Sequence, residues 1–213
     1  MSLSRRLALL EWARRADAWV VEDDYDSEFR YAGRPLAALQ GLDHGGRVIY
    51  LGTFSKTLFP ALRLGYLVVP PDLVDAFVAA RTVMDRQTTT LNQAVLADFI
   101  HEGHFLRHIC RMRTLYAERQ EVLLRAAGRE LGGLLEVCPC ETGLHLVGWL
   151  GDGWEDREAS QAATRAGVEA PALSPYRTEQ PGRQGLLLGY AASEVRQIRD
   201  AVRKLGPALA EGH

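Results

Sequence analysis

Three short apolar runs form the clearest pattern in the first third of the chain. They cover residues 18–22, 48–52 and 64–69 and are rich in β-branched and aromatic side chains. Near-continuous apolarity over about 4–8 residues predicts strands buried on both faces, as in a sheet covered by helices. An amphipathic helix over residues 4–16 precedes the first run. The pattern therefore predicts an α/β layer.

The pattern becomes helical after residue 71, and one predicted helix, over residues 104–131, is unusually long. A helix of about 28 residues exceeds the usual globular length and predicts a strut between two lobes. We therefore expect two domains, residues 1–103 and residues 104–213, the second containing a small α+β lobe. The remaining expected elements are helices over 72–86, 91–100, 154–166 and 194–205, and strand-like runs within 134–150 and 186–191.

Composition and charge exclude several classes of function. The 213 residues are 47% hydrophobic and 24% charged, as in ordinary folded proteins, with a net charge of −2. The chain lacks the net positive charge that attracts nucleic acid, so DNA binding by this chain is not expected. No stretch approaches the roughly 20 apolar residues that cross a bilayer, and we expect a cytoplasmic protein without membrane contact. The group of His101, Glu102, His104 and His108 lacks the spacing of a helical zinc site, so these histidines are interpreted as helix-surface residues and no metal is expected.

The basic residues are distributed unevenly between the two types. Only Lys56 and Lys204 are lysines, and the other 23 basic residues are arginines. Arginine cannot replace an amine that forms an imine, so each lysine is a candidate for chemistry. Lys204 lies near a predicted helix end, where a solvated cation is the ordinary interpretation. Lys56 instead follows the strand-like run 48–52, and the ends of strands in open α/β sheets are where ligands collect.

Lys56 could bind either of two kinds of ligand. A phosphate loop of the nucleotide-binding type needs glycine immediately before the lysine and again five positions earlier, where this chain has Ser55 and Tyr50. Pyridoxal phosphate needs an amine, a carboxylate for its pyridine nitrogen and donors for its phosphate. The chain offers hydroxyls and a guanidinium close to Lys56, and an acidic run at the end of the preceding strand. These candidates are Thr53, Ser55, Arg63, Glu22, Asp23, Asp24 and Tyr25.

These segments resemble the aminotransferase-type domain of MocR-type regulators of the GntR family. The matching motifs are residues 20–31 (VVEDDYDSEFRY), 52–56 (GTFSK), 62–66 (LRLGY), 143–145 (GLH) and 185–190 (GLLLGY), with Met112, Arg113, Tyr116 and Arg119 on the long helix. The resemblance covers nearly the whole chain. It implies an α/β fold: part of a fold-type I large domain with a mainly parallel sheet, plus a C-terminal α+β small domain.

The resemblance also implies roles for individual residues. Lys56 would be the catalytic, Schiff-base lysine, and Asp23 would pair with the pyridine nitrogen of pyridoxal 5'-phosphate. Tyr25 would donate to the phenolic oxygen of the cofactor. Thr53, Ser55 and Arg63 would hold its phosphate. Without the resemblance, Asp23 and Asp24 would be interpreted as a solvated acidic turn.

The chain departs from the family at the position that usually binds a carboxylate. Family members have an arginine in a Leu-Ser-Arg-Tyr segment, and this chain has Pro175 there. Arg177, two residues later, is a substitute candidate for binding the carboxylate of a substrate, and an exposed loop arginine is the alternative. Family members are also more than twice this length. We therefore expect the DNA-binding segment and the first half of the catalytic lobe to lie outside this chain.

Three functions remain open from the sequence. The first is a sensor of an amine or amino acid in a homodimeric regulator that contacts DNA only through the segment outside this chain. The second is an aminotransferase that moves an amino group between an amino acid and a 2-oxo acid. The third is a half-domain that binds nothing. For the chain alone, we expect little enzyme activity, weak or absent cofactor binding, and self-association through exposed apolar surface.

Overall fold

A computed structural model describes residues 1–33, 37–86, 89–178 and 182–210. The chain divides into two compact units. Unit 1 contains Met1–Glu28 and Arg34–Ile109, and unit 2 contains Phe29–Gly33 and Cys110–His213. The sequence placed the boundary between residues 103 and 104, whereas this division falls inside one helix, α6 (His104–Glu130). It also assigns five residues of the first half to unit 2.

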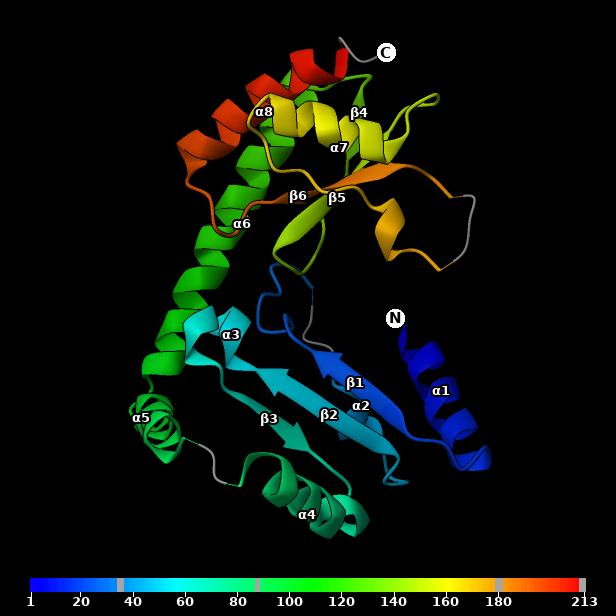
Figure 1. Ribbon diagram of the computed structural model, residues 1–213, viewed down its shortest axis with the longest axis vertical. Coiled ribbons are helices and arrows are strands. Elements are labelled where there is room, and N and C mark those ends of the chain that lie inside the picture. The colour runs from blue at the N-terminus through cyan, green and yellow to red at the C-terminus, as the bar shows by residue number, and fades with distance from the viewer. Residues whose placement is uncertain (34–36, 87–88, 179–181, 211–213) are drawn as a thin grey trace. The chain divides into compact units, whose positions relative to one another are not determined.

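Unit 1 is built on a three-stranded sheet of β1 (Val20–Asp24), β2 (Val48–Thr53) and β3 (Gly65–Val68), in that order (Figure 1). The three predicted strands are confirmed. β1 and β2 are parallel, and β2 and β3 are antiparallel. The expectation that all three are buried on both faces is wrong, because all four residues of β3 are exposed. Among the described residues, no element covers that strand enough to bury its apolar side chains.

Among the described residues of unit 1, two helices have four residues and three have 12 or 13. They are α1 (Leu3–Arg15), α2 (Leu39–Leu42), α3 (Phe54–Thr57), α4 (Val74–Asp85) and α5 (Thr90–His101), with 3-10 turns at Pro60–Leu62 and Pro71–Leu73. The predicted helix over 72–86 is thus a 3-10 turn followed by α4.

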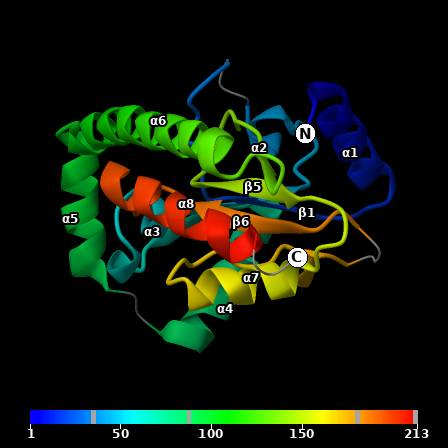
Figure 2. The ribbon, with the colours of Figure 1, turned by 90° about the horizontal axis from the view of Figure 1, so that it is seen from above.

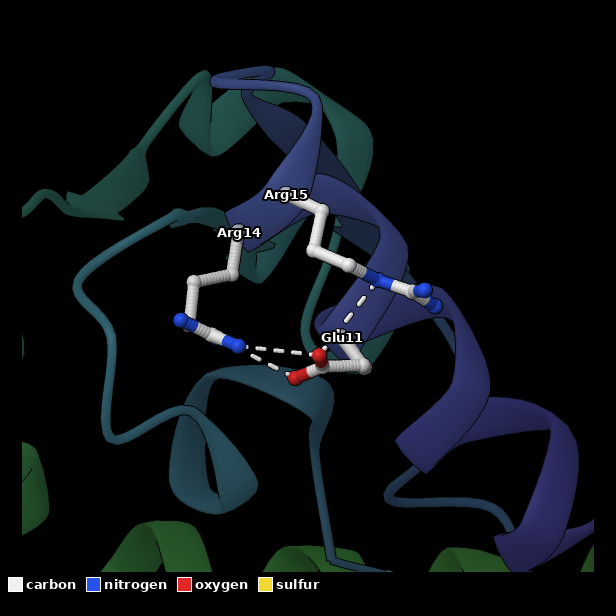
Figure 3. Close-up of polar contacts among 3 residues, drawn as sticks. All are labelled: Glu11, Arg14 and Arg15. Atoms are coloured by element: carbon white, nitrogen blue, oxygen red, sulfur yellow. Dashed lines mark hydrogen bonds and ion pairs between the residues drawn. The ribbon is translucent and has the colours of Figure 1, made fainter.

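The exposed face of α1 carries an ion-pair cluster near its C-terminal end (Figure 3). The Glu11 carboxylate accepts hydrogen bonds from the Arg14 guanidinium at 2.9 and 3.1 Å, and it lies 3.4 Å from Arg15. These i,i+3 and i,i+4 pairs suit helical spacing. The hydrogen bond from Arg14 lowers the pKa of Glu11. All three side chains are solvent-exposed, so the pairs add little to stability.

Unit 2 is an antiparallel sheet packed with helices, and it contains the main hydrophobic core. Its strands are β4 (Leu135–Val137), β5 (His145–Leu150) and β6 (Gly185–Gly189), in that order. Its helices are the later turns of α6, α7 (Asp156–Arg165) and α8 (Val195–Ala210). The helices α7 and α8 lie side by side, and α7 also contacts β6 (Figures 1 and 2).

The core of unit 2 is formed by one side of each helix and the inner residues of the strands. Val122, Leu131, Leu186 and Leu205 are among its members, and none is more than 5% exposed. Every residue of this cluster belongs to unit 2. Even the 27-residue α6 is not apolar enough to span a membrane, and the same holds for each of the other helices in the described ranges.

Candidate functional site

Lys56 lies on α3, the four-residue helix that begins where β2 ends. Thr53 is its N-cap residue, and the Thr53 Oγ1 accepts a hydrogen bond from the Ser55 N–H at 3.2 Å. Thr57 is buried, with 2% of its surface exposed, and its hydroxyl donates to the Thr53 carbonyl oxygen. Lys56 is exposed, and its amine forms no hydrogen bond or ion pair with any described residue. The local structure therefore buries Thr57 and leaves a free amine next to it.

The three carboxylates at the end of β1 have different environments. The Glu22 carboxylate accepts from the backbone N–H groups of Leu39 and Gln40, at 2.8 and 3.0 Å, and so caps α2. Asp24 accepts from the Tyr50 hydroxyl at 2.9 Å. Asp23 points to the opposite face of the strand, because side chains alternate along β1. It is exposed and accepts no hydrogen bond within the described residues.

The register of the sheet brings the Asp23 and Lys56 segments to one rim. β1 and β2 are parallel, with Asp23 beside Leu51 and Asp24 beside Gly52. This parallel pair agrees with the mainly parallel sheet that the resemblance implies. The free carboxylate is one strand away from the β2 end that leads into α3. This rim is the place where open α/β sheets bind ligands.

Tyr25 follows β1 directly and is half-exposed. Partial burial raises the pKa of its hydroxyl, and the nearby carboxylates of Asp26 and Asp23 raise it further. The Tyr25 hydroxyl therefore stays protonated at neutral pH and can act as a donor.

Two candidate phosphate ligands, Ser55 and Arg63, follow the end of β2. The Ser55 hydroxyl has no hydrogen-bond partner among the described residues. Arg63 has a left-handed backbone with φ of 50° and ψ of 35°, and its exposed side chain forms no ion pair within the described ranges. A left-handed residue other than glycine costs about 1–2 kcal/mol, and such strain is concentrated at functional sites.

Arg63 also lines a hollow of about 880 Å³ in unit 1. Phe54 and Tyr66 line it from the sheet side, and Arg81 and Asp85 line it from α4. Lys56, Asp23 and Tyr25 do not line this hollow. The structure therefore places Arg63 at a concave surface, and it places the other predicted residues at the open rim of the sheet.

An aromatic group beside the rim was missed from the sequence. The ring of Tyr66 lies 6.0 Å from that of Tyr50 and 5.5 Å from that of Phe54. A Cβ atom on Gly52 would lie only 2.3 Å from the Tyr66 ring, so any other residue there would force the ring to shift. Glycine inside a strand signals such a close approach.

Arg177 belongs to unit 2, after the 3-10 turn Ser174–Tyr176 that contains Pro175. Its NH1 atom is buried and has no hydrogen-bond partner in the described part of the chain. The backbone N–H of Ser174 donates to the buried Asp156 carboxylate at 2.8 Å, which holds this turn in place. The carboxylate-binding role of Arg177 stays a prediction.

The sequence matches the family described as Aminotransferase class I and II over residues 2–205. The chain belongs to this family. A curated relative is the probable rhizopine catabolism regulatory protein MocR of Rhizobium meliloti, which is 46% identical over 98% of this chain. Another is the uncharacterized HTH-type transcriptional regulator YhdI of Bacillus subtilis, which is 43% identical over 99% of the chain. The chain spans 42% and 45% of their lengths.

Solved aminotransferase structures have the same fold. Kynurenine aminotransferase of Pyrococcus horikoshii matches with a TM-score of 0.90 and 29% identity, over 99% of this chain and 52% of that chain. The α-aminoadipate aminotransferase LysN of Thermus thermophilus, complexed with a phosphopyridoxyl-leucine, matches with a TM-score of 0.89 and 29% identity, over 99% of this chain and 55% of its own. The aminotransferase class I and II family and these neighbours confirm the predicted fold class, and they identify pyridoxal 5'-phosphate as the cofactor of this fold.

Proposed function

We propose that this chain is part of the aminotransferase-like domain of a MocR-type regulator, in which pyridoxal phosphate bound at Lys56 senses an amine or amino acid. The observation that carries the proposal is that a free amine at Lys56 and a free carboxylate at Asp23 follow from neighbouring ends of two parallel strands. The 46% and 43% identities to regulators favour this function over a metabolic enzyme.

The chemistry of the available donors fits the cofactor. An amine, a carboxylate on the adjacent strand, a phenol and a guanidinium are groups that can hold pyridoxal phosphate. Within the described residues, Lys56, Asp23 and Arg63 have no competing ion pair. Neighbouring carboxylates are already used, since Glu22 caps α2 and Asp24 binds Tyr50. Asp23 is therefore the carboxylate at the end of β1 that remains available.

When bound, pyridoxal phosphate supplies an aldehyde that accepts an amine and a protonated ring that withdraws electrons. In this proposal Asp23 keeps the proton on the pyridine nitrogen. Tyr25 donates from its raised-pKa hydroxyl to the phenolic oxygen. Thr53, Ser55 and Arg63 bind the phosphate, with Arg63 providing a planar pair of donors. Lys56 would hold the cofactor covalently through its amine.

An aminotransferase is the second candidate function. It is favoured by the TM-scores near 0.90 to amino-acid aminotransferases, although those identities are near 29%. In this case Lys56 would also move a proton at the α-carbon of the substrate. Arg177, with its unpartnered NH1, is the proposed ligand for the substrate carboxylate.

The proposed partners follow from the relatives. We propose that the intact protein is a cytoplasmic homodimer that binds DNA through a segment other than these 213 residues. The net charge of −2 supports the assignment of DNA contact to another segment. The proposed small-molecule partner is an amine or amino acid, and its identity is the subject of the experiment below.

The test uses the longer protein that contains this chain, with Lys56→Ala and a matched control, Lys204→Ala. Lys204 is the other lysine of the chain and lies exposed on α8. Adding pyridoxal phosphate should produce visible absorbance in the wild type and in Lys204→Ala, but not in Lys56→Ala. Equal absorbance in Lys56→Ala would contradict the proposal.

A panel of amines and amino acids then separates the two functions. A sensor should show a spectral change with one class of amine and no conversion of added 2-oxo acid. An aminotransferase should convert the oxo acid to an amino acid with many turnovers. The 213-residue chain alone should bind the cofactor weakly, and strong absorbance from that chain would contradict this expectation.

A further inference from the structure

The short helix that carries Lys56 is held from outside by the first turns of α6. The His108 Nε2 lies 3.0 Å from the carbonyl oxygen of Thr57, the residue next to Lys56. One turn earlier on α6, the ring of Phe105 meets the ring of Phe54 edge to face, with centroids 5.8 Å apart. Phe54 is the first residue of α3 and Thr57 is its last. α6 therefore contacts both ends of the helix that carries the amine.

A helix of four residues needs such support. Isolated short helices are unstable in water, and the last carbonyl groups of a helix have no partner within it. The backbone N–H of Leu58 donates to the Phe54 carbonyl at 2.9 Å, which closes the single turn. The Thr57 carbonyl cannot bond within α3, and His108 fills that position.

The hydrogen bond fixes the chemistry of His108. A carbonyl oxygen only accepts, so the Nε2 atom must carry the proton and donate. The Thr57 side chain is directed inward and donates to the Thr53 carbonyl. Thr53 in turn accepts from Ser55 at the other end of α3. Both ends of α3, on either side of Lys56, are thus hydrogen-bonded. Of these hydrogen bonds, the one from His108 comes from a different helix, α6.

The neighbouring histidine makes different contacts. His104 stacks on Phe99, bonds to Glu102 at 2.9 Å and contacts the Arg107 guanidinium at 2.7 Å. These partners lie on α5, at its C-cap and on α6, and no contact between His104 and α3 is found among the described residues. It is therefore the matched control for His108, because it lies one turn away on the same helix.

We infer that His108 is a positioning residue for Lys56, and that it holds the amine in place by donating its Nε2 proton to the Thr57 carbonyl. This inference rests on the proposed function of Lys56. It assigns His108 no contact with the cofactor. Removing one such hydrogen bond should weaken attachment of the cofactor about two- to tenfold, because the net contribution of one hydrogen bond is of that size.

The test compares His108→Leu, His108→Gln and His104→Leu in the longer protein. The first reading is made without cofactor: the hydrogen exchange rate of the Leu58 amide, which bonds to Phe54 and reports the order of α3. The second is the equilibrium attachment of pyridoxal phosphate to Lys56. It is measured by absorbance and by borohydride trapping, in which water is lost as the amine condenses with the aldehyde and hydride then reduces the C=N bond.

His108→Leu should raise the Leu58 exchange rate and weaken attachment, while the unfolding midpoint identifies any loss caused by global instability. His108→Gln should restore most of both readings, since its amide can donate to the same carbonyl. His104→Leu should match the wild type. Unchanged Leu58 exchange in His108→Leu would overturn the inference, and so would equal losses in the glutamine variant. If the wild type does not bind the cofactor, the proposed function fails, and the exchange reading still decides whether His108 orders α3.

Discussion

The three adjacent carboxylates at the end of β1 lie in different environments. Strand alternation directs Glu22 and Asp24 to one face, where backbone amides of α2 and the Tyr50 hydroxyl occupy them. Asp23 faces the other way and stays free. An acidic run on a strand can therefore combine structural and functional residues without competition between them.

Arg63 allows a direct test of backbone strain. Its φ of 50° lies in the left-handed region, where glycine is favoured. Arg63→Gly should therefore be more stable than Arg63→Ala by about 1 kcal/mol, the reverse of the usual order. The measurement is the urea midpoint of each variant. Equal midpoints, or a more stable alanine variant, would show that the strain is small.

Both Arg63 variants lose the guanidinium, so both should bind phosphate-bearing ligand more weakly than the wild type. The glycine variant would then be the more stable and still deficient in binding. Stability and ligand binding thus favour different residues at this position.

The raised pKa of Tyr50 predicts that the protein loses stability at alkaline pH. Burial raises its pKa, and the hydrogen bonds with Tyr66 and Asp24 raise it further. The unfolded chain releases this proton near the ordinary tyrosine pKa of about 10, whereas the folded chain keeps it. Above that pH the unfolded state binds fewer protons, so the free energy of unfolding falls as the pH rises.

In Tyr50→Phe, the free energy of unfolding should fall less steeply with pH, by the equivalent of about one proton. The measurement is the urea midpoint between about pH 8 and pH 11. Tyr176→Phe, at an exposed position in unit 2, is the control for the loss of a tyrosine hydroxyl. An unaltered slope in Tyr50→Phe would contradict the assignment.

The pairing of β2 with β3 depends on one glycine. Gly52 lies beside Tyr66 in the register, and the Tyr66 ring occupies the space that a Cβ atom would need. Gly52→Ala should therefore destabilise unit 1 by about 1–3 kcal/mol through overpacking. Gly41→Ala on α2 is the control, because no atom lies within 4 Å of its added Cβ. A Gly52→Ala midpoint equal to that of the control would show that Tyr66 moves aside freely.

The elements themselves were largely predictable from the sequence. Apolar runs located β1, β2 and β3, and helical periodicity located α4, α5 and the long α6 within a few residues. The antiparallel direction of β3 was not predicted, because an apolar run does not encode strand direction. Turn geometry decides it, and the turn here includes the strained Arg63.

The sequence predicts which residues form the candidate site, but it does not predict how they are arranged in space. The motifs identified Lys56 and Asp23, but the separate tasks of Glu22 and Asp24 depend on the loop that brings α2 against β1. His108 was placed on a helix, and its contact with Thr57 joins residues 51 positions apart. Such contacts arise from tertiary packing, which local patterning does not contain.

The two units differ in how much apolar surface they bury. The main core belongs to unit 2, whereas unit 1 exposes Val78, Val83 and Met84 on α4 and Leu67 on β3. Val83 and Met84 are 83% and 82% exposed. Exposed apolar side chains next to an unpaired strand edge favour association.

The 213-residue chain should therefore self-associate as its concentration rises, as measured by light scattering. Leu67→Lys, which places a charge on the edge strand, should reduce the association. Tyr176→Lys is the control, since it removes an exposed aromatic side chain from unit 2. A monomer at all concentrations would contradict the prediction, and so would equal effects of the two variants.

The concentration of buried residues in unit 2 also bears on how the chain tolerates sequence change. Lys56, Asp23 and Arg63 lie in the unit with few buried side chains, and the cluster around Leu131 and Leu186 lies in the other. In a saturation mutagenesis screen, substitutions in unit 2 should mainly reduce the amount of protein recovered. Substitutions around the rim of unit 1 should mainly reduce ligand response at normal protein levels. Mutations that accumulate under selection should therefore change the ligand response of unit 1 more readily than the folded structure of unit 2.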